Sequence, residues 1–142
     1  SLCEQHPIIG ELLVSGLEKA QQQGDEWLRS VSRRLEFFQG DAREMDPGLI
    51  QKIDVIYLDP MFPERNKSAS VKKEMALFQS LLEGTESQSD AEDLLLWSLE
   101  QDVARVVVKR PAKAPNLARQ KPAHIIAGKS VRYDVYVRRA IR

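Results

Sequence analysis

The chain has 142 residues, of which 42% are hydrophobic and 30% are charged, with equal numbers of acidic and basic side chains. This composition is typical of a soluble globular domain and excludes a disordered or fibrous chain. The longest apolar stretches, Asp54 to Leu58 and Val103 to Val108, are far shorter than the roughly 20 residues that span a bilayer, so we expect no membrane segment. Cys3 is the only cysteine, which excludes an internal disulfide and fits a reducing cytoplasm, and no Cys/His cluster suggests a metal site.

The charges are unevenly distributed along the chain. From Val103 onward there are eleven basic residues and a single acidic one, Asp134. This asymmetry indicates a face that binds a polyanion, although a solvated basic edge would have the same composition.

Three elements are predicted in the amino-terminal part. Apolar residues recur at helical spacing from Pro7 to Gln23, and proline is favoured in the first turn of a helix. After Gly24, the stretch Asp25 to Ser32 predicts a short helix. The apolar and aromatic run Leu35 to Gln39 predicts a strand that stops at Gly40.

Two buried strands are predicted further along. Asp54 to Leu58 carries apolar side chains at alternating positions on both faces, which is typical of a strand covered by helices on both sides. One helix is expected from Val71 to Leu82 and a second from Ser89 or Asp90, before the next strand, Ala104 to Val108.

The carboxy-terminal part predicts a loop and a hairpin. The prolines of Ala112 to Pro122 favour a loop, and Ala123 to Ala127 and Arg132 to Val137 can pair as an antiparallel hairpin across Gly128. Strands that alternate with helices and end in a hairpin predict an α/β fold with a mostly parallel sheet. Ligands should bind at the carboxyl ends of its strands.

The clearest chemical motif is DPMFP, Asp59 to Pro63, directly after a buried strand. The Asp59 carboxylate and the Pro60 carbonyl can both accept hydrogen bonds from an exocyclic amine, and Phe62 offers a flat face on which a base can stack. This combination predicts a site that holds an aromatic amine. Asp-Pro after a strand is also common turn chemistry, so a rigid turn is the alternative.

DPMFP is followed by KSASVKKEMALFQSLL and later by VVVKRP and YDVYV, and together these segments resemble the RsmJ (YhiQ) family. The likeness extends from EQHPIIGELLVSGLEKA to the closing hairpin. It implies a class I, Rossmann-like fold and the methylation of guanine N2 in small-subunit (16S) ribosomal RNA, with S-adenosylmethionine as the cofactor. The partner would be this RNA or the assembled small subunit. Met61 replaces the second proline of the broader Asp/Asn-Pro-Pro-aromatic motif.

The resemblance also implies cofactor contacts. Glu4, at the end of a strand, would accept hydrogen bonds from the ribose hydroxyls, and Asp41, with Ala42 beside it, would contact the adenine amine. Asp59 would border the cofactor as well. An Asp after Gly40 is as often a turn former, so this alternative stays open for Asp41.

The family's Gly-rich cofactor loop has no counterpart here, because no Gly-x-Gly pattern occurs. Residues 1–142 are therefore expected to be one incomplete, carboxy-terminal part of the methyltransferase domain. We expect this polypeptide alone to bind S-adenosylmethionine weakly or not at all in a calorimetric titration. An affinity like that of an intact enzyme would contradict this expectation.

Four basic residues are candidates for phosphate contacts. Lys72 and Lys73 follow the site loop, where a solvated helix face is the alternative, and Lys109 and Arg110 end the next strand. Two other functions remain open from the sequence: a noncatalytic RNA-binding module that uses the basic carboxy-terminal face, and methylation of an amine on another nucleic acid or on a protein.

Overall fold

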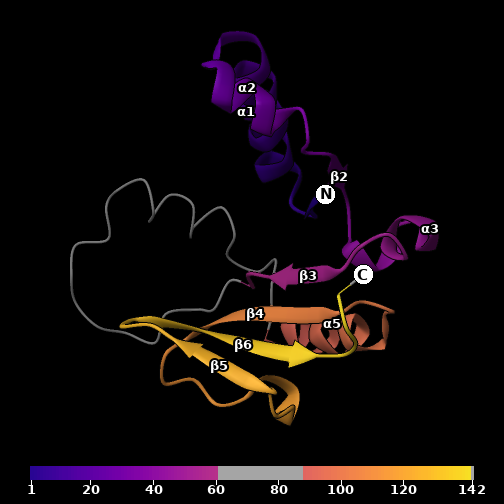
Figure 1. The fold of residues 1–142 in the computed structure, drawn as a ribbon, viewed down its shortest axis with the longest axis vertical. Coiled ribbons are helices and arrows are strands. Elements are labelled where there is room, and N and C mark those ends of the chain that lie inside the picture. The colour runs from indigo at the N-terminus through magenta and orange to yellow at the C-terminus, as the bar shows by residue number, and fades with distance from the viewer. Residues whose placement is uncertain (61–87, 142) are drawn as a thin grey trace. The chain divides into compact units, whose positions relative to one another are not determined.

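The computed structural model describes residues 1–60 and 88–141. They belong to two compact units, Ser1–Met45 and Asp46–Arg142, and each unit is described by itself. Figure 1 labels their helices and strands. The predicted helix Val71 to Leu82 lies outside the described residues.

The first unit contains two parallel strands and the two helices that lie between them in the chain. β1 (Leu2–Glu4) pairs with β2 (Phe37–Gln39), so that Glu4 lies opposite Gln39. The helices are α1 (Pro7–Gln23) and α2 (Glu26–Ser32). Both predicted helices are confirmed, and the predicted strand begins at Phe37 rather than at Leu35.

Side-chain caps explain where these helices begin. Nδ1 of His6 accepts a hydrogen bond from the Ile9 amide at 3.5 Å, and Oδ1 of Asp25 accepts one from the Leu28 amide at 2.7 Å. Each cap satisfies a backbone donor that the first helical turn leaves without a partner. His6 therefore has a structural role at the start of α1.

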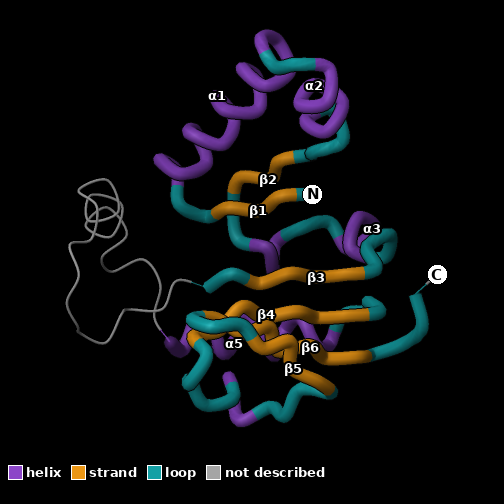
Figure 2. Tube along the Cα trace, turned by 60° about the vertical axis from the view of Figure 1, so that its left-hand side comes forward, coloured by secondary structure: helices purple, strands orange, loops and turns teal. Residues whose placement is uncertain are grey.

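The second unit is built on a four-stranded sheet in the order β3-β4-β6-β5, which Figure 2 shows as orange tubes. Its strands are β3 (Val55–Leu58), β4 (Arg105–Pro111), β5 (His124–Ala127) and β6 (Val131–Val137). β3 and β4 are parallel, whereas β6 is antiparallel to both β4 and β5. The predicted closing hairpin is confirmed, and β4 extends three residues beyond Val108, to Pro111.

Three short elements and one long helix complete the described residues. η1 (Ala42–Glu44) belongs to the first unit, and α3 (Pro47–Ile50), α5 (Gln88–Glu100) and η2 (Leu117–Arg119) belong to the second. The predicted helix from Ser89 or Asp90 is thus confirmed as α5, and η2 interrupts the segment that was expected to be a loop.

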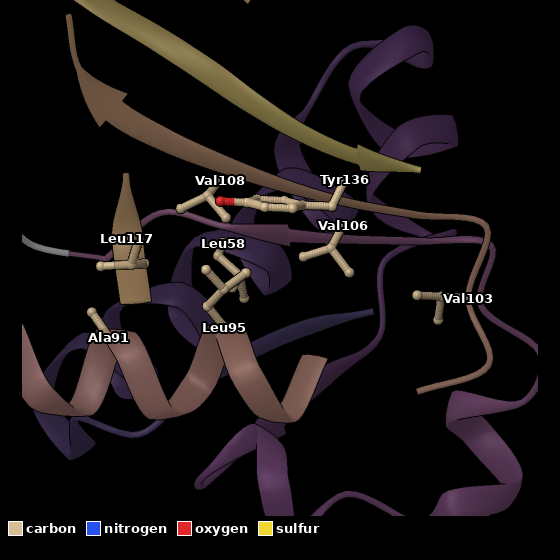
Figure 3. Packing of buried hydrophobic residues seen from close by; sticks show 8 residues of the cluster. All are labelled: Leu58, Ala91, Leu95, Val103, Val106, Val108, Leu117 and Tyr136. Carbon is tan, nitrogen blue, oxygen red and sulfur yellow. The ribbon is translucent and has the colours of Figure 1, made fainter. Parts of the chain in front are cut away.

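The core of the second unit lies between α5 and one face of the sheet (Figure 3). Leu95 of α5 and Val106 and Val108 of β4 are fully buried there. Burial of such side chains stabilises the fold by about 1.5–3 kcal/mol each. Leu58, the last residue of β3, belongs to the same cluster. The core therefore extends to the edge of the sheet where Asp59 follows β3.

The opposite face of β3 carries Val55 and Tyr57. These side chains point away from α5 and are 45% and 53% exposed. Among the described residues α5 covers the face of Leu58, and coverage of the opposite face by a second helix stays a prediction. The alternating pattern had indicated apolar side chains but not which face would be covered.

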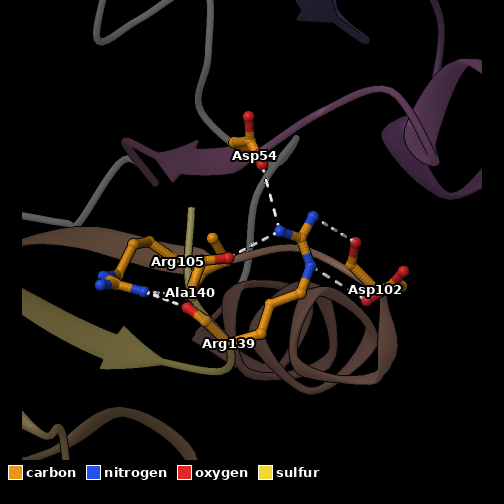
Figure 4. A network of polar contacts seen from close by, with 6 residues as sticks. Asp54, Asp102, Arg105, Arg139 and Ala140 are labelled. Atoms are coloured by element: carbon orange, nitrogen blue, oxygen red, sulfur yellow. Dashed lines mark hydrogen bonds and ion pairs between the residues drawn. The ribbon is translucent and has the colours of Figure 1, made fainter. Parts of the chain in front are cut away.

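A polar network fastens the chain after β6 to the start of β3 and β4 (Figure 4). The Arg139 guanidinium donates to Oδ1 of Asp102 at 3.1 Å and to Oδ1 of Asp54 at 3.2 Å. Arg105 donates in turn to the Arg139 carbonyl. This network lies at the amino-terminal ends of β3 and β4, away from the edge that carries Asp59.

Candidate active site

The sheet edge after β3 and β4 brings two charged side chains together. Leu58 of β3 lies opposite Val108 of β4. The next residue of each strand, Asp59 and Lys109, therefore lie side by side where the parallel pairing ends. Nζ of Lys109 donates to Oδ2 of Asp59 at 2.9 Å. The two side chains are 37% and 49% exposed, respectively, so the pair lies at the surface and is open to a ligand. The edge therefore presents a hydrogen-bond acceptor beside a cationic donor.

The Asp59–Lys109 contact affects the protonation of the lysine. The hydrogen bond from Nζ to Asp59, and then the negative charge of Asp59, raise the pKa of Lys109. Lys109 is therefore an ammonium at neutral pH and carries three N–H donors, of which Asp59 uses one.

Two tyrosines lie on the same face of the sheet as Lys109. Tyr133 of β6 is the cross-strand partner of Lys109, and Tyr57 of β3 comes two residues before Asp59. Their ring centroids are 6.5 Å apart across β4, with the planes tilted by 39°. This pair has no local signature in the sequence, although the alternation of strand side chains already places Tyr57 and Asp59 on one face.

The structure corrects the expectation for Arg110. Its side chain belongs to the α5 face of β4 and is only 4% exposed. It donates to the Pro115 carbonyl at 2.8 Å, and burial lowers the pKa of its guanidinium. A phosphate contact by Arg110 is therefore not supported. The alternation of Val106, Val108 and Arg110 along the strand explains this burial.

Lys109 also differs from the expectation. It lies within β4 and is bound to Asp59, where a separate phosphate contact had been predicted. Three other predicted site residues, Phe62, Lys72 and Lys73, lie outside the described residues. Pro60 directly follows Asp59 at the sheet edge and is partly buried.

Two of the three acidic residues predicted to contact the cofactor lie at one edge of the first unit. Glu4 ends β1, and Asp41 follows Gly40 just beyond β2. Because β1 and β2 are parallel, their carboxyl ends meet at this edge. The Gly40 amide donates to the Glu4 carbonyl at 2.9 Å and holds the two segments together. Gly40 has φ +145°, a conformation that strongly favours glycine.

Both carboxylates already hold local structure. Oε1 of Glu4 accepts from the His6 amide at 2.8 Å, at the start of α1. Oδ1 of Asp41 accepts from the Arg43 amide at 2.9 Å and caps η1, whose first residue is Ala42. The side-chain hydrogen bond from Arg43 is the main cause that lowers the pKa of Asp41. The turn-forming role that the sequence allowed for Asp41 is thus present in the structure.

Gly10 of α1 leaves room for the side chain of Gln39 at this edge. The Gln39 side chain donates to the carbonyls of Glu4 and Gln5 at 2.9 and 3.1 Å. A Cβ added at Gly10 would lie 1.6 Å from Oε1 of Gln39. Gly10 is therefore a packing residue that lets Gln39 fasten the segment after β1.

Gly10→Ala is expected to destabilise the protein by up to about 2 kcal/mol, because the new methyl group displaces the exposed Gln39 amide and breaks its hydrogen bonds to the Glu4 and Gln5 carbonyls. Gly16→Ala is the matched control in the same helix: nothing lies within 4 Å of its added Cβ. That change should stabilise the protein by about 0.5–1 kcal/mol, the usual gain of alanine over glycine in a helix. Denaturant unfolding measures both, and equal stabilisation by the two changes would contradict this packing role.

The described residues lack two other kinds of site. In this part of the chain, no helix is long and apolar enough to cross a membrane. The same residues contain no group of three or more His, Cys, Asp or Glu side chains that could hold a metal ion.

Comparisons with known proteins connect this geometry to a family. A family model described as "Putative SAM-dependent methyltransferase" matches residues 1–138. Proteins named ribosomal RNA small subunit methyltransferase J are 44% identical in Shewanella baltica (strain OS185) and 42% identical in Shewanella sp. (strain MR-4), across the whole chain in both cases. The chain belongs to the RsmJ family.

The fold agrees with this membership. The crystal structure of the SAM-dependent methyltransferase NGO1261 from Neisseria gonorrhoeae is similar with a TM-score of 0.68 and 33% sequence identity, over 95% of this chain and 53% of that one. The expected class I methyltransferase fold is thereby confirmed for the part of the domain that this chain supplies. The chain spans about half the length of its RsmJ relatives, 56% of the S. baltica protein and 53% of the protein from strain MR-4.

Proposed function

We propose that the protein transfers a methyl group from S-adenosylmethionine to the exocyclic N2 amine of a guanine in 16S ribosomal RNA. The observation that carries this proposal is the position of Asp59, an exposed carboxylate directly after β3 and next to Pro60, at the sheet edge where α/β folds bind ligands. RsmJ membership supports the choice of cofactor and of small-subunit RNA.

Asp59 and Pro60 would position the amine for the reaction. The carboxylate and the Pro60 carbonyl each accept one N–H of the guanine amino group, and this turns the nitrogen lone pair toward the methyl donor. When bound, S-adenosylmethionine supplies an electrophilic methyl group on a sulfonium. The guanine nitrogen held by Asp59 and Pro60 would accept this methyl group and release one proton to solvent. Orientation of this kind can supply a large part of the rate enhancement without a covalent enzyme intermediate.

Glu4 and Asp41 are the proposed cofactor contacts of the first unit. Ribose hydroxyls and the adenine amine are hydrogen-bond donors, and carboxylates are acceptors, so the residues present fit these parts of S-adenosylmethionine. The parallel pairing of β1 and β2 supports this assignment, because it places both residues at one strand-end edge. Ala42 would border the adenine beside Asp41.

The target guanine must leave its stack to reach Asp59, which is least costly in single-stranded or looped RNA. Phe62 is the proposed stacking partner, and Lys72 and Lys73 remain proposed phosphate contacts. The partner would be small-subunit RNA or the assembled small subunit in the cytoplasm.

The distribution of basic side chains weighs against the noncatalytic RNA-binding alternative. Arg132 pairs with Asp134, and Arg139 pairs with Asp54 and Asp102. Lys109 pairs with Asp59, and Arg110 is buried. Four of the eleven basic residues counted after Val103 are therefore engaged within the fold, which leaves fewer of them for a broad surface that binds RNA.

The test is transfer of labelled methyl from S-adenosylmethionine to small-subunit RNA that lacks the modification, catalysed by the full-length protein. Label in this RNA is the expected result. RNA binding without any transfer, to naked RNA or to assembled subunits, would favour the noncatalytic alternative, and label in another nucleic acid or in protein would replace the proposed substrate.

A further inference from the structure

We propose that Lys109 is a specificity residue that donates a hydrogen bond to O6 of the target guanine while Asp59 holds the amine. This inference rests on the proposed function and goes beyond it, because it assigns recognition of the guanine ring to a residue outside the DPMFP motif.

The geometry of the pair carries the inference. Lys109 contacts Oδ2 of Asp59 at 2.9 Å, and among the described residues Oδ1 has no such partner, which leaves it to accept from an incoming amine. Nζ keeps two further donors that can point to the same ligand. Because the side chains come from adjacent parallel strands in register, the backbone fixes the acceptor and the donor next to each other.

The edge of guanine is complementary to this arrangement. Its N2 amine and N1–H are donors, and O6, on the other side of N1, is an acceptor. A carboxylate can accept from N2 and N1 while an ammonium beside it donates to O6. Adenine has a ring nitrogen acceptor next to its amine and carries no O6, so the same carboxylate would face a lone pair and the ammonium would have no oxygen to bind. The Asp59–Lys109 pair therefore favours guanine over adenine.

Other uses of Lys109 fit the structure less well. Its Nζ is held beside the residue that binds the amine, so a base seated on Asp59 comes within its reach before a backbone phosphate does.

The test compares Lys109→Met with the wild type in the full-length protein on two RNAs. One is small-subunit RNA with guanosine at the nucleotide that the wild type labels, and the other, made by ligation, has 2-aminopurine there, which keeps the N2 amine but lacks O6 and N1–H. Loss of a hydrogen bond from a charged donor is expected to lower kcat/KM on guanosine by about 10- to 100-fold. On 2-aminopurine the two proteins should have equal kcat/KM.

Two further variants test whether a loss of activity in Lys109→Met comes from the missing donor to guanine or from the missing positive charge. Lys109→Arg keeps a cationic donor and should retain more activity on guanosine than Lys109→Met. Lys113→Met removes the same charge from an exposed loop position and should leave the preference for guanosine unchanged. An equal loss on both RNAs for Lys109→Met, or no loss on guanosine, would overturn the inference. Absence of label with the wild-type protein would instead overturn the proposed function.

Discussion

Asp59→Ala in the full-length protein is expected to lower methyl transfer by about 100- to 1000-fold, the effect typical of removing a group that acts directly on the reacting atoms. Binding of small-subunit RNA should change little, because the substitution removes one contact to the base and none to a phosphate. Transfer of labelled methyl and RNA affinity, measured on the same preparation, test both parts of this expectation.

Asp93→Ala is the matched control for Asp59→Ala. Asp93 is exposed on α5, outside the sheet edge, and the same charge is removed. This variant should transfer methyl groups at the wild-type rate. If Asp59→Ala also retained the wild-type rate, the proposed amine site would be wrong and DPMFP would be a structural turn.

Arg132→Leu is expected to have the largest effect on stability. Asp134 is fully buried, and its two carboxylate oxygens accept from Nε and Nη2 of Arg132 at 2.8 and 3.0 Å. Removal of one partner of a buried ion pair leaves the other charge poorly compensated and costs about 3–5 kcal/mol. Denaturant unfolding followed by the fluorescence of Trp97, in α5, reports on this unit when Trp27, in α2 of the first unit, is replaced by Phe.

Arg138→Leu is the control for Arg132→Leu, because Arg138 is exposed just after β6. It should change the free energy of unfolding by no more than about 0.5 kcal/mol. The double variant Arg132→Leu/Asp134→Leu should recover part of the loss, because both charges then leave the core. Equal small effects of Arg132→Leu and Arg138→Leu would show that Arg132–Asp134 does not stabilise the fold.

The elements that could be predicted from the sequence are those with local signals. Pro7, the cap at Asp25 and the turn at Gly128 mark the start of α1, the start of α2 and the centre of the hairpin. Each depends on contacts within a few residues. The motif at Asp59 was recognisable for the same reason, since a carboxylate directly after an apolar strand stands out in the sequence.

The features that could not be predicted depend on contacts between distant segments. The pairing of Asp59 with Lys109 follows from the register of β3 and β4, which are joined by a long connection. The exposure of Tyr57 follows from which face α5 covers. Arg110 could be predicted in part. Strand alternation shows which face of β4 it lies on, but its hydrogen bond to the Pro115 carbonyl is visible only in the structure.

Methylation of an exocyclic guanine amine held by Asp59 can be tested by nucleoside analysis of small-subunit RNA after transfer of labelled methyl by the full-length protein. Wild type and Asp59→Ala are compared side by side. We expect label in N2-methylguanosine with the wild type and almost none with the variant. Label in any other nucleoside, or equal label with both proteins, would contradict this expectation.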